Sequence, residues 1–140
     1  MTASVNSSDE QRPLVRLCFL PNWEQTNYGE IKGGARLIIE YARERIYEWP
    51  GHGGAYGPRD WWHYAHLRFH PGGPQESITL FYPDLPQKPS RNPAMVTVPA
   101  GAEQLEIWFE HVLYHFEPHK QPYVFWDSRY GENYWFTVTS

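Results

Sequence analysis

The segment Glu103–His111, EQLEIWFEH, alternates between apolar and polar side chains. Its inward candidates recur at every second residue, at Leu105, Ile107 and Phe109. Successive side chains of a β-strand point to opposite faces, so this pattern predicts a strand with one buried face. An amphipathic helix would instead place apolar residues three and four positions apart.

Eight short segments carry strand patterns, and turn-forming residues separate them. The expected strands cover residues 14–20, 35–42, 61–70, 77–82, 94–100, 103–111, 122–126 and 134–139. Pro99, near the end of the fifth segment, indicates a sheet edge because proline has no N–H for a strand ladder. The stretch 21–34 is rich in turn formers and is expected to be a loop.

Residues 35–49, ARLIIEYARERIYEW, admit a helix as a competing interpretation, because alanine, leucine, arginine and glutamate tolerate helices well. Two glycines precede the segment and two isoleucines, Ile38 and Ile39, lie at the centre of residues 35–42, which favours a strand there. Leu37, Ile39 and Tyr41 would then face inward.

Composition agrees with an all-β fold. Aromatic residues make up 17% of the 140 residues, with 13 prolines and 11 glycines. Aromatic side chains favour strands, and proline and glycine favour the turns between them. We expect an all-β, antiparallel β-sandwich of about eight strands, immunoglobulin-like, over residues 14–140. A disordered polar tail is expected at residues 1–13.

Charge and cysteine content narrow the classes of partner. Lys and Arg total 12 and Asp and Glu total 16, a net charge of −4. This argues against nucleic acid, which needs clustered cations, and gives no reason to expect an anionic membrane surface. The first residues lack the basic and apolar stretches of a secretory signal, so the cytoplasm is the expected location. Cys18 is expected to be a small buried hydrophobe.

The segment Phe125–Phe136, FWDSRYGENYWF, holds six aromatic residues in twelve. Its two flanking strands are expected to form a hairpin or near-hairpin, with Trp126 at the rim. Asp127 would cap the turn through an Asx-turn, and Gly131 would supply a positive φ. The aromatic rings either pack the end of the sandwich or present faces to a flat ligand.

Three segments, WDSRYGENY, VTVPAGAEQLEIWFEH and RDWWHYAHLRFH, give the chain a resemblance to starch-binding carbohydrate-binding modules. The order of these features is similar over roughly residues 33–138. The chain also resembles small uncharacterised bacterial single-domain proteins that share the PGG, VPAGA and WDSRYGENY patterns. The first resemblance implies a β-sandwich in which two tryptophans form a stacking cleft for sugars. It implies a ligand-binding set of Trp61 or Trp62 from the early strand, Trp126, His52 and Asn133. Asp127, which follows Trp126, is expected to join this set.

A non-catalytic protein that holds an α-glucan or a related glycan is therefore the leading expectation. The alternative is a small cytoplasmic enzyme or ligand-binding protein with an aromatic and His-lined pocket on the same scaffold. An adaptor or a homodimer stays open as well, because exposed Trp, Tyr and Arg are also hot-spot residues of protein interfaces.

Catalytic residues are left unassigned. Asp60, Glu110 and Asp127 lie at expected strand ends and are acid–base candidates if they meet in a pocket. The seven histidines form no HExxH or two-His-plus-carboxylate spacing. We expect no metal site and no cofactor.

Overall fold

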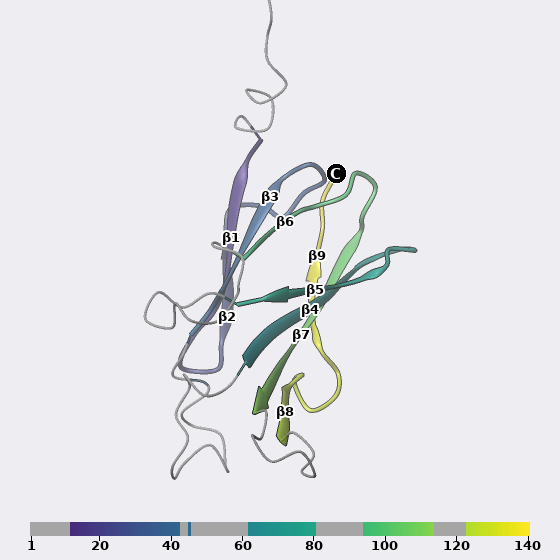
Figure 1. Cartoon of the computed structure of the whole chain (residues 1–140). Helices are drawn as coiled ribbons and strands as arrows, with labels where there is room; N and C mark the ends of the chain where they lie inside the picture. The colour runs from purple at the N-terminus through teal and green to yellow at the C-terminus, as the bar shows by residue number, and fades with distance from the viewer. Residues whose placement is uncertain (1–11, 43–44, 46–61, 81–93, 114–122) are drawn as a thin grey trace, which may run out of the picture.

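The computed structural model describes residues 12–42, 45, 62–80, 94–113 and 123–140, which form an all-β sandwich of two sheets (Figure 1). The strands are β1 (Leu14–Phe19), β2 (Gln25–Tyr28), β3 (Arg36–Tyr41), β4 (Trp62–His70), β5 (Gln75–Thr79), β6 (Met95–Thr97), β7 (Gln104–Leu113), β8 (Tyr123–Asp127) and β9 (Tyr134–Thr137). No helix in this part of the chain has the length and apolar character to cross a membrane.

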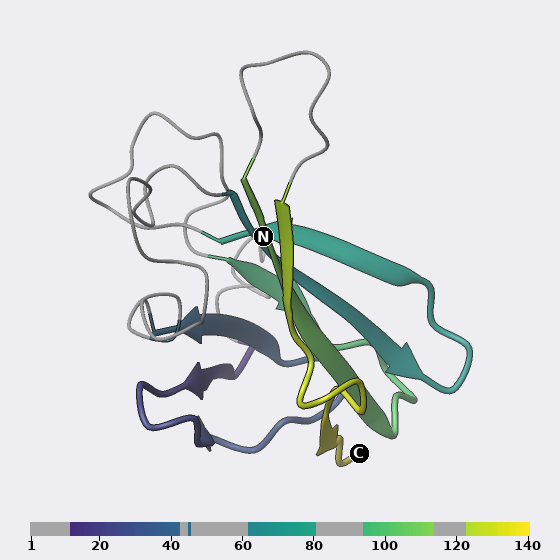
Figure 2. The ribbon, with the colours of Figure 1, turned by 90° about the horizontal axis from the view of Figure 1, so that it is seen from below.

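The two layers have four and five strands. The first sheet has the order β2-β1-β3-β6, and the second has the order β5-β4-β7-β8, with β9 also paired to β7. Viewed from below, purple and blue strands of the first sheet lie apart from the teal and green strands of the second (Figure 2). Strand β6 pairs only with β3 among the described strands, so the edge position predicted from Pro99 is confirmed.

Strand β2 corrects the prediction of a continuous loop over residues 21–34. Gln25–Tyr28 pairs antiparallel with Arg16–Phe19 of β1. Its side chains are half-buried or exposed. An edge strand of this kind needs backbone hydrogen bonds but little side-chain burial, so it leaves no alternating pattern in the sequence.

The sequence led us to expect antiparallel pairing throughout, but the first sheet also contains a parallel pair of strands. Strand β1 pairs in parallel with β3, from Leu14 beside Arg36 to Phe19 beside Tyr41. The chain reaches this arrangement by turning back through β2 on one side of β1 and crossing to the other side. The backbone N–H of Arg36 donates to the carbonyl of Pro13 at 2.8 Å and extends the contact beyond the strands.

The core lies between the sheets, where the inward faces predicted by alternation are buried. These buried residues include Val15, Leu17, Phe19, Leu37, Ile39, Tyr41, Leu105, Ile107 and Phe109. Burying one such side chain stabilises the fold by roughly 1.5–3 kcal/mol.

Strands β8 and β9 do not form the predicted hairpin, because both pair with β7 along the same edge. Asp127 at the end of β8 lies opposite Phe109, and Tyr134 at the start of β9 lies opposite Ile107. Between these two pairs, β7 contains a single residue, Trp108, whereas the other chain segment contains residues 128–133, which therefore loop out. Figure 1 shows this loop in yellow beside β7, with β8 and β9 on either side of it. The two strands behave as one strand interrupted by a six-residue excursion.

Candidate functional site

The structure places the predicted tryptophans Trp62 and Trp126 on one face of one sheet. Tyr64, Glu110 and Trp126 form a cross-strand row, and directly opposed side chains share a face. Trp62 precedes Tyr64 by two residues on β4 and so points to the same side. Trp126 is 53% exposed. The other two predicted aromatic and imidazole residues, Trp61 and His52, lie outside the described residues.

Trp126 belongs to a group of three side chains on this outer face. The Nε2 of His66 and the Oε1 of Glu110 are 2.7 Å apart. The ring of His66 lies 6.0 Å from that of Trp126, at an interplanar angle of 40°. The Nδ1 of His66 is 2.7 Å from the hydroxyl of Ser77. Since a carboxylate only accepts, Nε2 of His66 carries the proton and donates to Glu110.

A second group lies further along the same face. His70 Nε2 donates to Glu106 Oε1 at 2.8 Å. The His70 ring stacks on Trp135 at 5.1 Å and 28°, and Trp135 is 45% exposed. The predicted residue Asn133 joins this group, because its Nδ2 donates to Glu106 Oε2 at 2.7 Å.

The carboxyl group of Glu106 stays ionised well into the acidic range. Partial burial by itself raises its pKa. Hydrogen bonds from His70 and Asn133, with the positive charges of His70 and Arg68, outweigh burial and lower the pKa of Glu106 below its usual value. Glu106 is therefore a charged hydrogen-bond acceptor at neutral pH.

Trp108 lies between the two groups on β7, and its ring is 5.8 Å from that of His66. We call this surface the indole face; it consists of His66, His70, Glu106, Trp108, Glu110, Trp126 and Trp135. It is a carboxylate- and imidazole-bearing aromatic surface on the outside of the five-stranded sheet. It can stack flat apolar rings and accept or donate hydrogen bonds beside them.

The sequence contains the parts of the indole face but not their arrangement. The alternation of residues 103–111 puts Glu106, Trp108 and Glu110 on the side opposite the inward residues, and His66 and His70, four residues apart on one strand, share a side. What joins them is the register between β4 and β7, in which His66 lies opposite Trp108. No local pattern in either strand encodes that register.

Asp127, predicted as a ligand-binding residue, points instead into the interior and is 4% exposed. Its Oδ2 accepts from the Tyr41 hydroxyl at 2.6 Å and from Arg45 Nη1 at 3.1 Å, and its Oδ1 accepts from the Tyr134 hydroxyl at 2.6 Å. In the turn itself, the hydroxyl of Ser128 accepts from the backbone N–H of Gly131 at 3.2 Å. Ser128, rather than Asp127, supplies the side-chain cap of this loop.

Arg45 is fully buried beside Asp127. It donates to the carbonyls of Leu20 and Glu24, at 2.8 Å each. Its guanidinium lies 5.0 Å from the centre of the Trp23 ring and is also within 6 Å of three further rings, those of Phe19, Tyr41 and Tyr134. Hydrogen bonds and the faces of aromatic rings together offset the cost of burying the charged guanidinium.

A chain of hydrogen bonds continues from Asp127 to two buried histidines. The hydroxyl of Tyr41 is 3.3 Å from Nε2 of His111, and Nδ1 of His111 is 2.9 Å from Nδ1 of His63. Because Tyr41 donates to Asp127, it accepts from His111, whose Nδ1 then accepts from His63 in the neutral pair. We call Arg45, Asp127, Tyr41, Tyr134, His111 and His63 the interior cluster.

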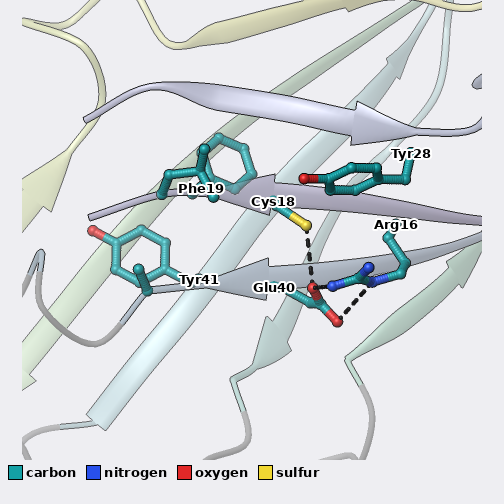
Figure 3. A pocket seen from close by; sticks show the side chains of 8 residues that line it. Arg16, Cys18, Phe19, Tyr28, Glu40 and Tyr41 are labelled. Carbon is teal, nitrogen blue, oxygen red and sulfur yellow. Dashed lines mark hydrogen bonds and ion pairs between the residues drawn. The ribbon is translucent and has the colours of Figure 1, made fainter. Parts of the chain in front are cut away.

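A pocket of about 250 Å³ lies on the first sheet, lined in part by Arg16, Cys18, Tyr28 and Glu40 (Figure 3). Arg16 forms two hydrogen bonds with Glu40, at 2.7 and 3.2 Å, and the Cys18 thiol donates to the same carboxylate at 3.1 Å. Burial, and then the hydrogen bond and negative charge of Glu40, raise the pKa of Cys18 to about 11. The thiol is therefore protonated at neutral pH and is a poor nucleophile.

Within the described ranges, no group of three or more His, Cys, Asp or Glu side chains is arranged to hold a metal ion.

A family model described as "Family of unknown function (DUF6209)" matches residues 6–139, and the chain belongs to this family. No curated protein and no solved structure matches the chain significantly.

Proposed function

We propose that the protein is a non-catalytic module that binds an α-glucan or a related glycan on the indole face. The observation that carries the proposal is the exposure of Trp126 and Trp135 beside carboxylate–imidazole pairs on one sheet face. The C–H faces of pyranose rings stack on indoles, and sugar hydroxyls hydrogen-bond with carboxylates and imidazoles. The resemblance to starch-binding modules supports the same ligand class.

The hydrogen bonds within the indole face favour binding because they fix the groups before a ligand arrives. His66 is held between Ser77 and Glu110, and Glu106 is held between His70 and Asn133. A surface that is already ordered loses less side-chain entropy when it binds. The affinity is nevertheless modest, since an open sheet face covers only one side of a sugar.

The experiment that tests the proposal is affinity electrophoresis in native gels that contain soluble starch, glycogen or a linear β-glucan. The glycan is expected to retard the wild-type protein. Trp126→Ala removes one exposed ring and is expected to weaken retention about tenfold, which corresponds to roughly 1.4 kcal/mol.

Tyr28→Ala provides a matched control, because Tyr28 is as exposed as Trp126 but belongs to β2 in the other sheet. This variant is expected to migrate as the wild type does. The proposal is wrong if none of the polysaccharides retards the wild-type protein, or if Tyr28→Ala and Trp126→Ala lose the same retention.

A small-molecule-binding protein or enzyme is the second candidate, and the pocket beside Cys18 is the observation in its favour. We rank it lower because the Cys18 thiol, whose pKa is raised to about 11, is protonated at neutral pH and is a poor nucleophile. The polar groups of the interior cluster hydrogen-bond to one another, although Tyr41 also lines this pocket.

A further inference from the structure

We infer that the indole face contains two equivalent subsites arranged in tandem, which bind one linear polysaccharide chain lying along β7. This inference rests on the proposed glycan-binding function and specifies how the chain is held. Each subsite consists of one tryptophan, one glutamate and one histidine. The first is Trp126, Glu110 and His66, and the second is Trp135, Glu106 and His70.

The two subsites have the same construction. In each, the tryptophan lies directly opposite the glutamate of β7, at Trp126–Glu110 and at Trp135–Glu106. In each, Nε2 of a β4 histidine donates to that glutamate, at 2.7 Å and 2.8 Å. The imidazole in turn lies against the tryptophan, with ring centres 6.0 Å and 5.1 Å apart.

A simple translation along the sheet relates one subsite to the other. Glu106 and Glu110 are separated by four residues on β7, and His66 and His70 by four residues on β4. A strand rises about 3.3–3.4 Å per residue, so the two subsites are offset by about 13 Å. This offset runs parallel to β7 and is longer than one pyranose ring.

The loop between β8 and β9 places the two tryptophans in equivalent positions beside β7. Trp126 and Trp135 belong to different strands, and residues 128–133 loop out between them. Because this excursion spans only Trp108 on β7, it returns the chain with Trp135 opposite Glu106 and on the same face as Trp126. Without the excursion, the continuing strand would place another residue opposite Glu106.

A repeated site fits a ligand that repeats. One sugar stacks on Trp126 and a later sugar of the same chain stacks on Trp135, while Trp108 lies under the segment between them. Binding at the second subsite is then intramolecular, so a chain that spans both binds more tightly than either end alone. A disaccharide occupies one subsite at a time.

The test uses isothermal titration calorimetry with an oligosaccharide ladder, from disaccharide to heptasaccharide, of whichever polysaccharide retards the wild-type protein most. We expect a sharp gain in affinity, at least tenfold, once the oligosaccharide spans about 13 Å, followed by a plateau. The stoichiometry is expected to change from two disaccharides per protein to one long chain per protein.

Variants separate the subsites. Trp126→Ala and Trp135→Ala are each expected to abolish the gain with length, to bind one disaccharide, and to weaken the longest oligosaccharide by similar factors. Trp135 Nε1 also donates to the carbonyl of Glu132 at 2.9 Å, so Trp135→Ala risks disturbing the loop. Trp135→Phe keeps a stacking ring without that donor and is expected to keep the length dependence.

Two results overturn the inference while leaving the proposed function in place. The first is glycan binding with an affinity independent of chain length. The second is length-dependent binding that Trp135→Ala leaves unchanged. Absence of all glycan binding by the wild-type protein overturns the proposed function and this inference together.

Discussion

The buried side chain of Asp127 holds in place the part of β8 that carries Trp126 of the proposed glycan site. Its carboxylate on β8 accepts from Tyr41 on β3, so it connects the two sheets. Burial, and then the hydrogen bond and charge of Asp127, raise the pKa of Tyr134 far above its usual value, which keeps that phenol a donor. Trp126, the preceding residue, points to the opposite face of the sheet. Asp127 thereby positions the backbone that presents Trp126.

Replacing this carboxylate should be costly. Asp127→Asn keeps the shape of the side chain but leaves the buried charge of Arg45 uncompensated, which is expected to lower the free energy of unfolding by about 3–5 kcal/mol. Urea unfolding measures the change. The matched control is Glu40→Gln, which weakens the exposed ion pair with Arg16 and should cost less than about 1 kcal/mol. Equal costs for the two variants would contradict the anchoring role of Asp127.

At the scale of elements, the loop 128–133 is built from left-handed backbone. Arg129, Tyr130 and Gly131 have φ values of 49°, 59° and 87°, and Asn133 has 63°. The backbone N–H of Asn133 donates to the carbonyl of Ser128 at 2.7 Å and closes the loop. Only glycine adopts such angles freely, and asparagine tolerates them better than most residues. The loop thus combines one unstrained glycine with two strained side-chain-bearing positions.

This backbone predicts opposite effects at neighbouring positions. Gly131→Ala should destabilise the protein by about 1 kcal/mol, because alanine is strained at this φ even though no atom crowds the new Cβ. Tyr130→Asn should stabilise it by about 0.5 kcal/mol, because asparagine tolerates the left-handed backbone at this position better than tyrosine does. Since the Tyr130 side chain is fully exposed, its removal costs no packing. Thermal unfolding of the two variants and the wild-type protein measures both stability changes. Shifts of the same sign would contradict the strain argument.

At the scale of the whole molecule, the interior cluster joins both sheets through a chain of polar groups. His63 on β4 and His111 on β7 belong to the second sheet, and Tyr41 on β3 belongs to the first. The Nδ1 atoms of the two histidines are 2.9 Å apart, so one of them has to lack a proton. The folded protein therefore accommodates at most one imidazolium in this pair without breaking the contact.

This restriction predicts an acid-sensitive fold. In the unfolded chain both imidazoles bind protons below a pH of about 6.5, so the unfolded state takes up more protons there. The free energy of unfolding then falls as the pH drops below that value. His63→Gln keeps an N–H donor for His111 but does not titrate, and it is expected to flatten this slope. Urea unfolding at several pH values measures it, and an unchanged slope would contradict the mechanism.

A second loss of stability is expected at lower pH. The pKa of Glu40 is lowered first by its hydrogen bond with Arg16, and the pKa of Glu106 is lowered by His70 and Asn133 despite burial. Both carboxylates contribute stability above their unfolded pKa of about 4.3, which is lost as the pH falls through their folded values. His63→Gln should leave this lower window unchanged, which separates the two effects.

The sequence by itself determined the strands with buried faces and hence the β-sandwich. Leu105, Ile107 and Phe109 alternate because each strand buries one face, and that signal is local. The sequence also predicted the positive φ of Gly131, because glycine adopts such an angle without the steric strain that a side chain would bring. An exposed ring at Trp126 was one of two readings that the sequence left open.

The tertiary structure alone decided which strands pair and in which register. The parallel pairing of β1 with β3, the weakly patterned β2 and the end-to-end placement of β8 and β9 all depend on backbone hydrogen bonds between distant segments. Those bonds are the same for every residue type except proline, so side-chain patterns carry little information about them. Register is also what sets Trp126 opposite Glu110 and Trp135 opposite Glu106. The repeated surface proposed to hold a glycan exists only because four strands, β4, β7, β8 and β9, are aligned in space.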